Sequence, residues 1–326
     1  MVVTHHRVAT WTRQLVSGGF NVAAGRWITC RPVNEPNAHE RRPNHLAVLE
    51  AATTDAWRGC SLKAAENDAL GAAGWRGLLG GNHERDWPGT GSLYENNDSG
   101  GECGVLAEIM FFVPAENKVK YWYSTDYGMF RFCIADSEHD WREGTEQYKF
   151  IEHCLTSVDR QRQPWLIFLS HRVLVYSSDL SYAVQGSFGE PMAKESLQKL
   201  WQKYKVDIAI YGHVHNYERA CPICENQCTA DEKRYYKGSL KGMIHVVAGV
   251  GGASLSPFTT LKTKWSLYRD CDYGFVKLTA FDHSNLLFEY KKSSDRKVHD
   301  SFRKSRDYRD ILTCTVDSCP ATTLAS

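Results

Sequence analysis

Three short segments of the sequence carry side chains that can bind a metal ion. They are Gly81-Asn82-His83-Glu84, Ser170-His171 and Gly212-His213-Val214-His215. Neutral imidazole suits zinc, iron and manganese, and the carbonyl oxygen of an Asn side chain suits the harder of these cations. Because residues two apart on an extended chain face the same way, His213 and His215 can reach one metal or straddle two adjacent metals. Each segment thus offers a nitrogen or amide-oxygen ligand to a metal ion.

These segments follow stretches that have the character of strands or tight turns. The run WLIFL at 165–169 is short and continuously apolar, which is typical of a strand buried on both faces, and it leads directly to His171. The run VDIAIY at 206–211 ends at Gly212. Ligands of open α/β sheets bind at the carboxyl ends of strands. We therefore expect the three segments to converge on one cleft.

The chain between residues 129 and 290 has the alternating order of strands and helices that indicates an α/β protein. Tyr148, Ile151 and Leu155 recur at helical spacing after Thr145, which can cap a helix. The further expected elements are strands at 129–135 and 243–248, helices at 145–158 and 190–204, and a hairpin of strands 274–281 and 285–290.

Residues 1–76 differ in character from the rest of the chain. Arg, Ala, Trp, Gly and His are scattered there without a sustained period of two or 3.6 residues. Short helices are conceivable at His45–Thr53 and Ser61–Leu70, and no buried strand is evident. The chain is expected to divide into an atypical, poorly ordered or irregular segment, 1–76, and an ordered domain, 77–326.

Composition excludes several classes of protein. The 326 residues are 42% hydrophobic, as in globular proteins, and the net charge of +1 gives no argument for binding nucleic acid or an anionic membrane. No apolar run approaches the length of a membrane span. The N-terminus also lacks the apolar stretch of a signal peptide.

Eleven cysteines are present, an odd number that leaves at least one thiol unpaired within the chain. Cys221, Cys224 and Cys228 cluster in CPICENQC, and Cys314 and Cys319 lie near the end. A zinc knuckle would need a fourth ligand at the usual spacing, whereas a disulfide needs one partner for each cysteine. Disulfides in a secreted protein are the favoured interpretation. The glycosylation sequon at Asn97 agrees with secretion.

From about Gly81 to Ser326 the sequence resembles the plant purple acid phosphatases, which are calcineurin-like metallophosphoesterases. The similar stretches are GNHERDWPGTGSLY, YWYSTDYGMFRFCIADSEHDWREGTEQY, PWLIFLSHRVLVYSS and YGHVHNYERACPIC. The resemblance is greatest to the larger members described as nucleotide pyrophosphatase/phosphodiesterase-like. It implies an α/β fold, a calcineurin-like β-sandwich flanked by helices, which would be incomplete at its N-terminal side.

The resemblance also assigns roles to individual residues. Asn82, His171 and His213 would bind a divalent metal, zinc or manganese, and His215 would bind a ferric ion. His83 would act as the catalytic residue that helps to protonate the leaving group, and Glu84 would orient His83. The family hydrolyses phosphate esters with two metals, one of which activates a hydroxide. The implied substrates are phosphate esters or nucleotides, and the implied location is secreted or vacuolar.

Two motifs of the family are missing from the expected positions. In the family, the motifs D-x-G and G-D-x-x-Y supply a carboxylate to the ferric ion, the carboxylate that bridges the two metals, and the tyrosinate that colours the protein. The aspartates of residues 1–80 are Asp55 and Asp68, and neither stands in such a motif. The ferric site would then keep only His215, whereas three ligands can hold zinc. We expect at most one divalent metal, poor hydrolysis and no purple colour.

Three interpretations of function remain open. The chain is a phosphoesterase of the acid phosphatase or nucleotide phosphodiesterase type with half of its dinuclear site missing. Alternatively, it is a catalytically inactive metal-binding or interaction protein on the same fold. The third interpretation is a fragment from an altered gene model, which the patternless composition of residues 1–76 favours over a genuine paralogue that lost catalysis.

Overall fold

The computed structural model describes residues 47–54, 59–64, 76–82, 120–173, 177–178, 194–224, 227–251, 254–259 and 263–312. Every described residue belongs to the second of two units of the chain, His45–Ser326. The expected division of the chain at residue 76 stays a prediction.

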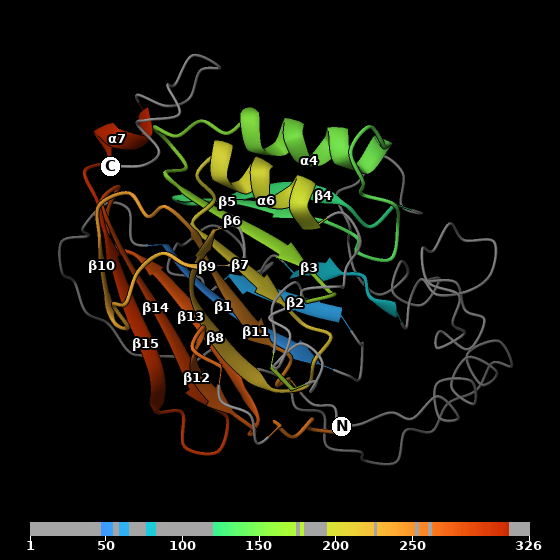
Figure 1. Ribbon diagram of the computed structural model, residues 1–326, viewed down its shortest axis with the longest axis vertical. Helices are drawn as coiled ribbons and strands as arrows, with labels where there is room; N and C mark the ends of the chain where they lie inside the picture. Colours follow the sequence, from blue (N-terminus) through green and yellow to red (C-terminus); the bar gives the residue numbers. More distant parts are fainter. Residues whose placement is uncertain are drawn as a thin grey trace, which may run out of the picture. The chain divides into compact units, whose positions relative to one another are not determined.

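One sheet of the second unit has seven strands in the order β10-β15-β14-β13-β1-β2-β3 (Figure 1). Neighbouring strands are antiparallel except for the parallel pair β10 and β15. The strands are β1 (Ala47–Thr54), β2 (Gly59–Ala64), β3 (Arg76–Leu79), β10 (Tyr235–Lys237), β13 (Gly274–Ala280), β14 (Asn285–Lys292) and β15 (Val298–Ser305).

The other sheet has the order β12-β8-β11-β7-β6-β5-β4, with β9 paired to β8. Its centre is parallel: β5, β6, β7 and β11 run in one direction. The strands are β4 (Tyr123–Tyr127), β5 (Phe130–Ile134), β6 (Trp165–Ser170), β7 (Ile208–Tyr211), β8 (Tyr217–Cys224), β9 (Gln227–Cys228), β11 (Met243–Ala248) and β12 (Ser266–Asp270).

Alternation along the parallel strands divides their side chains between two hydrophobic cores. Ile167 and Leu169 of β6 pack in a core shared with Val276, Leu278 and other residues of the seven-stranded sheet. Their neighbour Phe168 joins the opposite core, which contains residues of the helices. Because both faces are covered, every residue of β6 is buried, as its continuous apolar run predicted. The two sheets thus form a sandwich.

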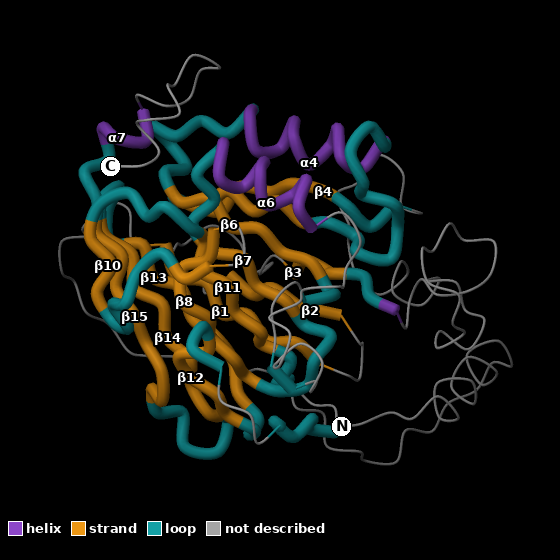
Figure 2. The backbone as a smooth tube through the Cα atoms, in the orientation of Figure 1, coloured by secondary structure: helices purple, strands orange, loops and turns teal. Residues whose placement is uncertain are grey.

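Helices α4 (Glu146–Thr156) and α6 (Lys194–Lys203) cover the outer face of the eight-stranded sheet, and α7 (Arg309–Leu312) is short (Figures 1 and 2). The Thr145 side chain accepts a hydrogen bond from the Tyr148 N–H and caps α4 as expected. Ile151 and Leu155 of α4 and Leu197 of α6 face the sheet. Within the described segments, none of the helices is long and apolar enough to cross a membrane.

The expected elements between residues 129 and 290 are confirmed, with small shifts at their ends. The expectation for the N-terminal part was wrong where the structure describes it. His45–Thr53 was expected to be helical, but Ala47–Thr54 is strand β1, paired with β13 and β2. Ser61 also lies in a strand, β2. Pairing with β13, more than 200 positions away, overrides the weak local propensity of this segment. Local periodicity in the sequence does not reveal such a pairing.

Two disulfides lie within the described residues. Cys221–Cys228 joins β8 to β9, which confirms the disulfide interpretation for this pair. Cys133–Cys154 joins β5 to α4 and was not anticipated, since its cysteines are 21 positions apart in a strand and a helix. Cys314 and Cys319 lie outside the described residues.

Candidate metal centre

Two of the predicted ligands follow neighbouring parallel strands. Ser170 of β6 pairs with Tyr211 of β7, and one residue later the Gly212 N–H donates to the His171 carbonyl oxygen at 3.1 Å. His171 and His213 therefore leave the sheet at the same edge, the carboxyl end of the parallel strands. This is the position that the strand pattern predicted.

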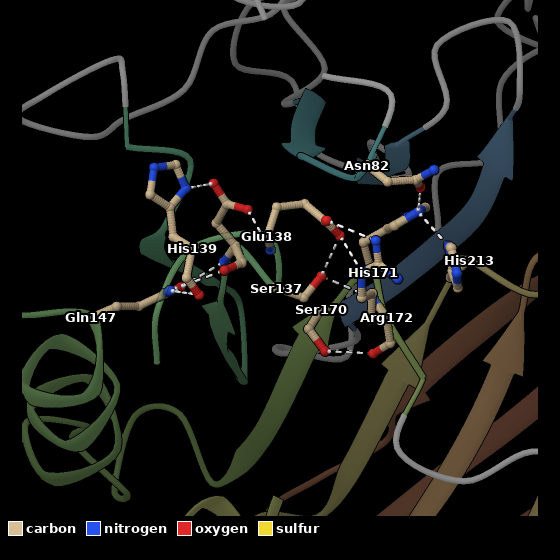
Figure 3. Close-up of polar contacts among 10 residues, drawn as sticks. Asn82, Ser137, Glu138, His139, Gln147, Ser170, His171, Arg172 and His213 are labelled. Carbon is tan, nitrogen blue, oxygen red and sulfur yellow. Dashed lines mark hydrogen bonds and ion pairs between the residues drawn. The ribbon is translucent and has the colours of Figure 1, made fainter. Parts of the chain in front are cut away.

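The side chains of Asn82, His171 and His213 are in contact (Figure 3). His171 Nε2 lies 2.7 Å from Asn82 Oδ1 and 3.2 Å from His213 Nδ1. The two imidazole rings meet edge to face with their centroids 5.0 Å apart. Asn82 and His171 are buried, and His213 is half-buried. Residues distant in sequence thus converge on one cluster, as expected for these three.

Gly81 gives the cluster the room that it needs. A Cβ atom at this position would lie 2.6 Å from His171 Cδ2 and Cγ, closer than side chains pack. The backbone before Asn82 therefore runs directly against the imidazole. Any larger residue at position 81 would displace the His171 ring or the segment that carries Asn82.

The donor atoms fit a single divalent cation. Two ligand atoms about 2.0–2.1 Å from one tetrahedral zinc ion lie roughly 3.3 Å apart. The separation of 3.2 Å between His171 Nε2 and His213 Nδ1 agrees with that value. The separation of 2.7 Å to Asn82 Oδ1 is that of a hydrogen bond. Since a carbonyl oxygen only accepts, His171 Nε2 carries the proton in this arrangement, and a cation would take the place of that proton.

Among the described residues, no group of three or more His, Cys, Asp or Glu side chains is placed to hold a metal. The cluster therefore relies on an amide oxygen as its third donor. His215 lies on the same loop as His213, and its Nδ1 hydrogen bonds to the Ser254 carbonyl oxygen at 2.9 Å. A ring that donates from Nδ1 has its lone pair on Nε2, which is the form that binds metals. His83, Glu84, Asp55 and Asp68 lie outside the described residues, so their roles stay predictions.

A buried ion pair supports the loop that carries His171. Arg172 Nε and Nη2 donate to the two carboxylate oxygens of Glu138 at 2.8 and 3.0 Å (Figure 3). The Arg172 N–H donates to Ser137 Oγ at 2.9 Å. Both charged side chains are buried. The pair joins the loops after β5 and β6 in a planar, two-bond geometry that fixes the residue next to His171.

Glu138 and Arg172 were not among the site residues expected from the sequence. Glu138 lies in the polar segment that follows strand β5. Because β5 is parallel to β6 and ends at the same edge of the sheet, this segment could have been recognised as part of the site. The same segment holds His139, whose Nδ1 lies 2.7 Å from Asp136 Oδ2, and Gln147 of α4 binds both the N–H and the carbonyl oxygen of Asp136.

Glu218 of β8 anchors Ser177, which lies beyond His171 in the chain. The Ser177 N–H donates to Glu218 Oε2 at 2.7 Å, and the hydroxyls of Ser177 and Ser266 donate to Oε1. Arg269 Nε lies 3.3 Å from Oε1. Burial raises the pKa of the Glu218 carboxyl above its ordinary value, although these hydrogen bonds and Arg269 oppose the rise.

Comparison with known proteins identifies the family. Residues 68–217 match the family described as calcineurin-like phosphoesterase, and residues 242–301 match the one described as iron/zinc purple acid phosphatase-like protein C. A nucleotide pyrophosphatase/phosphodiesterase of Hordeum vulgare is 66% identical over 249 residues, which are 76% of this chain and 68% of the barley protein. The chain belongs to the purple acid phosphatase family. The fold expected from the sequence is thereby confirmed.

Other relatives are longer than this chain. "Probable inactive purple acid phosphatase 1" of Arabidopsis thaliana is 73% identical over 76% of the chain but only 41% of its own length. The purple acid phosphatase PPD1 from yellow lupin seeds superposes with a TM-score of 0.70, at 72% identity, over 76% of this chain and 43% of the lupin chain. The chain therefore spans about two fifths of these two relatives.

Proposed function

We propose that this chain is a purple acid phosphatase-type phosphoesterase with one divalent metal position, formed by Asn82, His171 and His213. Its substrates would be phosphate esters or nucleotides, and its hydrolysis would be slow. The observation that supports the proposal is the convergence of Asn82 Oδ1, His171 Nε2 and His213 Nδ1 at distances of 2.7 and 3.2 Å. Membership of a phosphoesterase family supplies the reaction class.

The chain's own residues would divide the work of binding and proton transfer. A cation bound here would lower the pKa of a coordinated water and stabilise negative charge on the phosphoryl oxygens. Asn82, His171 and His213 would position it, with Gly81 and the Arg172–Glu138 pair holding the His171 ring. His83 would donate a proton to the leaving oxygen, and Glu84 would orient His83. His215 would contribute to the ferric position of the family.

A second candidate is a metal-binding protein without catalysis. It is favoured by the lack of D-x-G and G-D-x-x-Y before Gly81, since a bridging carboxylate is what allows two cations to lie close together. The name of the Arabidopsis relative points the same way. Both candidates require the same metal position, but they differ in turnover. The disulfides Cys133–Cys154 and Cys221–Cys228 support the proposed secreted or vacuolar location, because disulfides persist in oxidising compartments.

Zinc titration by calorimetry tests the metal position. We expect one zinc ion per chain, and we expect His171→Ala to weaken binding by at least about a hundredfold because a direct ligand is lost. The matched control is His299→Ala, which removes a histidine paired with Asp295 at the surface. Unchanged affinity in His171→Ala would refute the metal position.

Hydrolysis of p-nitrophenyl phosphate and of its bis ester at mildly acidic pH separates the two candidates. Slow, zinc-dependent hydrolysis that is absent from His171→Ala and retained by His299→Ala supports the phosphoesterase. Zinc binding without any hydrolysis supports the second candidate. A visible absorption band in iron-loaded protein would contradict the single-metal proposal, because that colour requires a tyrosinate bound to ferric iron.

A further inference from the structure

A cavity of about 450 Å³ lies between α6 and the strands β8 and β11. Val206, just before β7, and Met243, the first residue of β11, line it. His213 follows the opposite end of β7, which spans four residues or about 13 Å at about 3.3 Å per residue. The cavity is therefore separate from the metal centre, and its volume falls in the range of small-molecule sites, about 300–1,000 Å³.

The deep wall of the cavity is apolar. Trp201, Ile223 and Met243 line it and are at least 95% buried. Gln202 of α6 ties the helix to the loop before β11 by donating from Nε2 to the Lys241 carbonyl oxygen at 2.5 Å. This hydrogen bond joins two of the walls. The interior suits an aromatic or aliphatic group.

The charged residues that line the cavity are all cationic: Lys199, Lys203 and Lys205, with no Asp or Glu among the described lining residues. Lys203 Nζ lies 3.9 Å from a carboxylate oxygen of the exposed Glu152, and Lys205 Nζ donates to a neutral carbonyl oxygen, that of Asp310. The rim thus offers positive charge to an anion.

Two of the lining residues also carry buried hydrogen-bond donors that lack a partner in the described structure: Trp201 Nε1 and Gln198 Nε2. Buried donors are satisfied in the great majority of cases, and a buried donor without a hydrogen bond destabilises the folded protein. An oxygen of a bound ligand, reached by a small rotation of the Gln198 side chain, would satisfy such a donor.

We propose that this cavity binds a small organic anion with an apolar body, such as an aromatic or acyl carboxylate or sulfonate. The apolar body packs against Trp201, Ile223 and Met243, and the acidic group lies toward Lys199 and Lys203. The proposed site does not depend on the metal centre, so its test does not depend on whether the chain hydrolyses phosphate esters.

Titration of the whole chain with anilinonaphthalene sulfonate, an aromatic anion that fluoresces in apolar sites, tests the proposal. We expect saturable binding of one molecule per chain. Lys199→Gln and Lys203→Gln each weaken it by about threefold, or about 0.6 kcal/mol, as expected for a partly exposed charge contact. Ser239→Trp, which introduces an indole at the cavity wall, abolishes binding. The matched control Lys149→Gln changes an exposed lysine of α4 that does not line the cavity and leaves binding unchanged.

Competition resolves which part of the ligand is recognised. The uncharged N-phenylnaphthylamine should bind more weakly than the sulfonate, and inorganic phosphate should not displace the sulfonate. Displacement by phosphate alone, or equal binding of the neutral compound, would overturn the proposed ligand class. Binding that survives Ser239→Trp and both lysine substitutions would place the dye elsewhere and refute the site. If Ser239→Trp does not fold, the lysine variants decide the question.

Discussion

The polar groups at the two ends of strand β7 have different kinds of partner. At the amino end, the buried Asp207 is surrounded by cations: Lys304 Nζ lies 2.6 Å from Oδ1, Arg306 also contacts Oδ1, and Arg160 Nη1 lies 3.7 Å from Oδ2. At the carboxyl end, His171 Nε2 lies against both His213 Nδ1 and Asn82 Oδ1, and a bound cation would take the place of the proton on this nitrogen. At the amino end of β7, the chain supplies the counter-charges for Asp207 itself. At the carboxyl end, it supplies ligand atoms for a cation that would have to come from solution.

The charges at the amino end determine the state of Asp207. Burial by itself raises the pKa of this carboxyl, but Arg306, Lys304 and Arg160 outweigh burial and hold the pKa well below its ordinary value. The Leu166 N–H also donates to Oδ2, at 2.9 Å. Asp207 is therefore a structural anion that links β6, β7 and the end of β15. A perturbed pKa alone does not distinguish such a cluster from a functional site.

The largest expected effect comes from Asp207→Asn. The substitution leaves three buried cations without their anion, so we expect a loss of about 3–5 kcal/mol in the free energy of unfolding, measured by urea denaturation. Asp231→Asn, at an exposed position, is the control and should change stability by less than about 0.5 kcal/mol. A loss below about 1 kcal/mol in Asp207→Asn would show that the cations relax into solvent.

The sign of the pH dependence follows from the depressed pKa. A carboxyl whose pKa is lower in the folded state stabilises the protein above its unfolded pKa of about 3.8 and loses that contribution as the pH falls through the folded value. The stability of Asp207→Asn should therefore fall less steeply than that of the unchanged protein below about pH 3.8. Parallel acid denaturation curves for the two proteins would contradict this account.

A smaller effect is expected from Gly81→Ala at the other end of the strand. Its Cβ would lie 2.6 Å from the His171 ring, and overpacking of this kind costs about 1–3 kcal/mol. The ring would also move away from His213, so zinc affinity measured by calorimetry should fall together with stability. Gly80→Ala is the matched control, because its Cβ would approach Tyr121 only to 3.1 Å. Equal zinc affinity in the two variants would argue against the ring position as the determinant.

The smallest expected effect on stability comes from Glu218. Its buried carboxyl accepts hydrogen bonds from hydroxyl groups, whereas that of Asp207 is surrounded by several cations. Its pKa is raised, so its contribution to stability is fully present below the unfolded value of about 4.5 and is lost as the pH rises through the folded value. Glu218→Gln, which resembles the protonated acid, should remove this decline while changing stability by about 1 kcal/mol. Thermal unfolding followed as the pH rises from about 4.5 measures the slope. A slope that persists in Glu218→Gln would assign it to another group.

Local pattern in the sequence predicted the parts of the fold whose partners are near in the chain. The apolar run that became β6, the helix capped by Thr145 and the hairpin of β13 and β14 each carry their own signal. Strand β1 carries no such signal, although its partner β2 follows within a few residues, and its other partner, β13, lies at the other end of the chain. Pairings that depend on distant chain cannot be found from local periodicity.

Some residues of the candidate site could likewise be predicted from local sequence, and others could not. His171 and His213 were predictable because each directly follows a recognisable parallel strand, and Asn82 because it stands in a family motif. The Arg172–Glu138 pair was not, since a buried ion pair requires knowledge of which loops meet. Gly81 also looked like an ordinary turn residue in the sequence, and its importance became evident only from the closeness of the His171 ring.

The contacts of His171 with Asn82 and His213 have a consequence for how much folded protein exists. A cation that binds only when these distant stretches are assembled acts as a removable cross-link. At a free concentration of about one hundred times its dissociation constant, it adds about 2.7 kcal/mol to the stability of the folded state. The steady-state level of the folded chain would then follow the supply of metal in the compartment where it folds, whether or not any ester is ever hydrolysed.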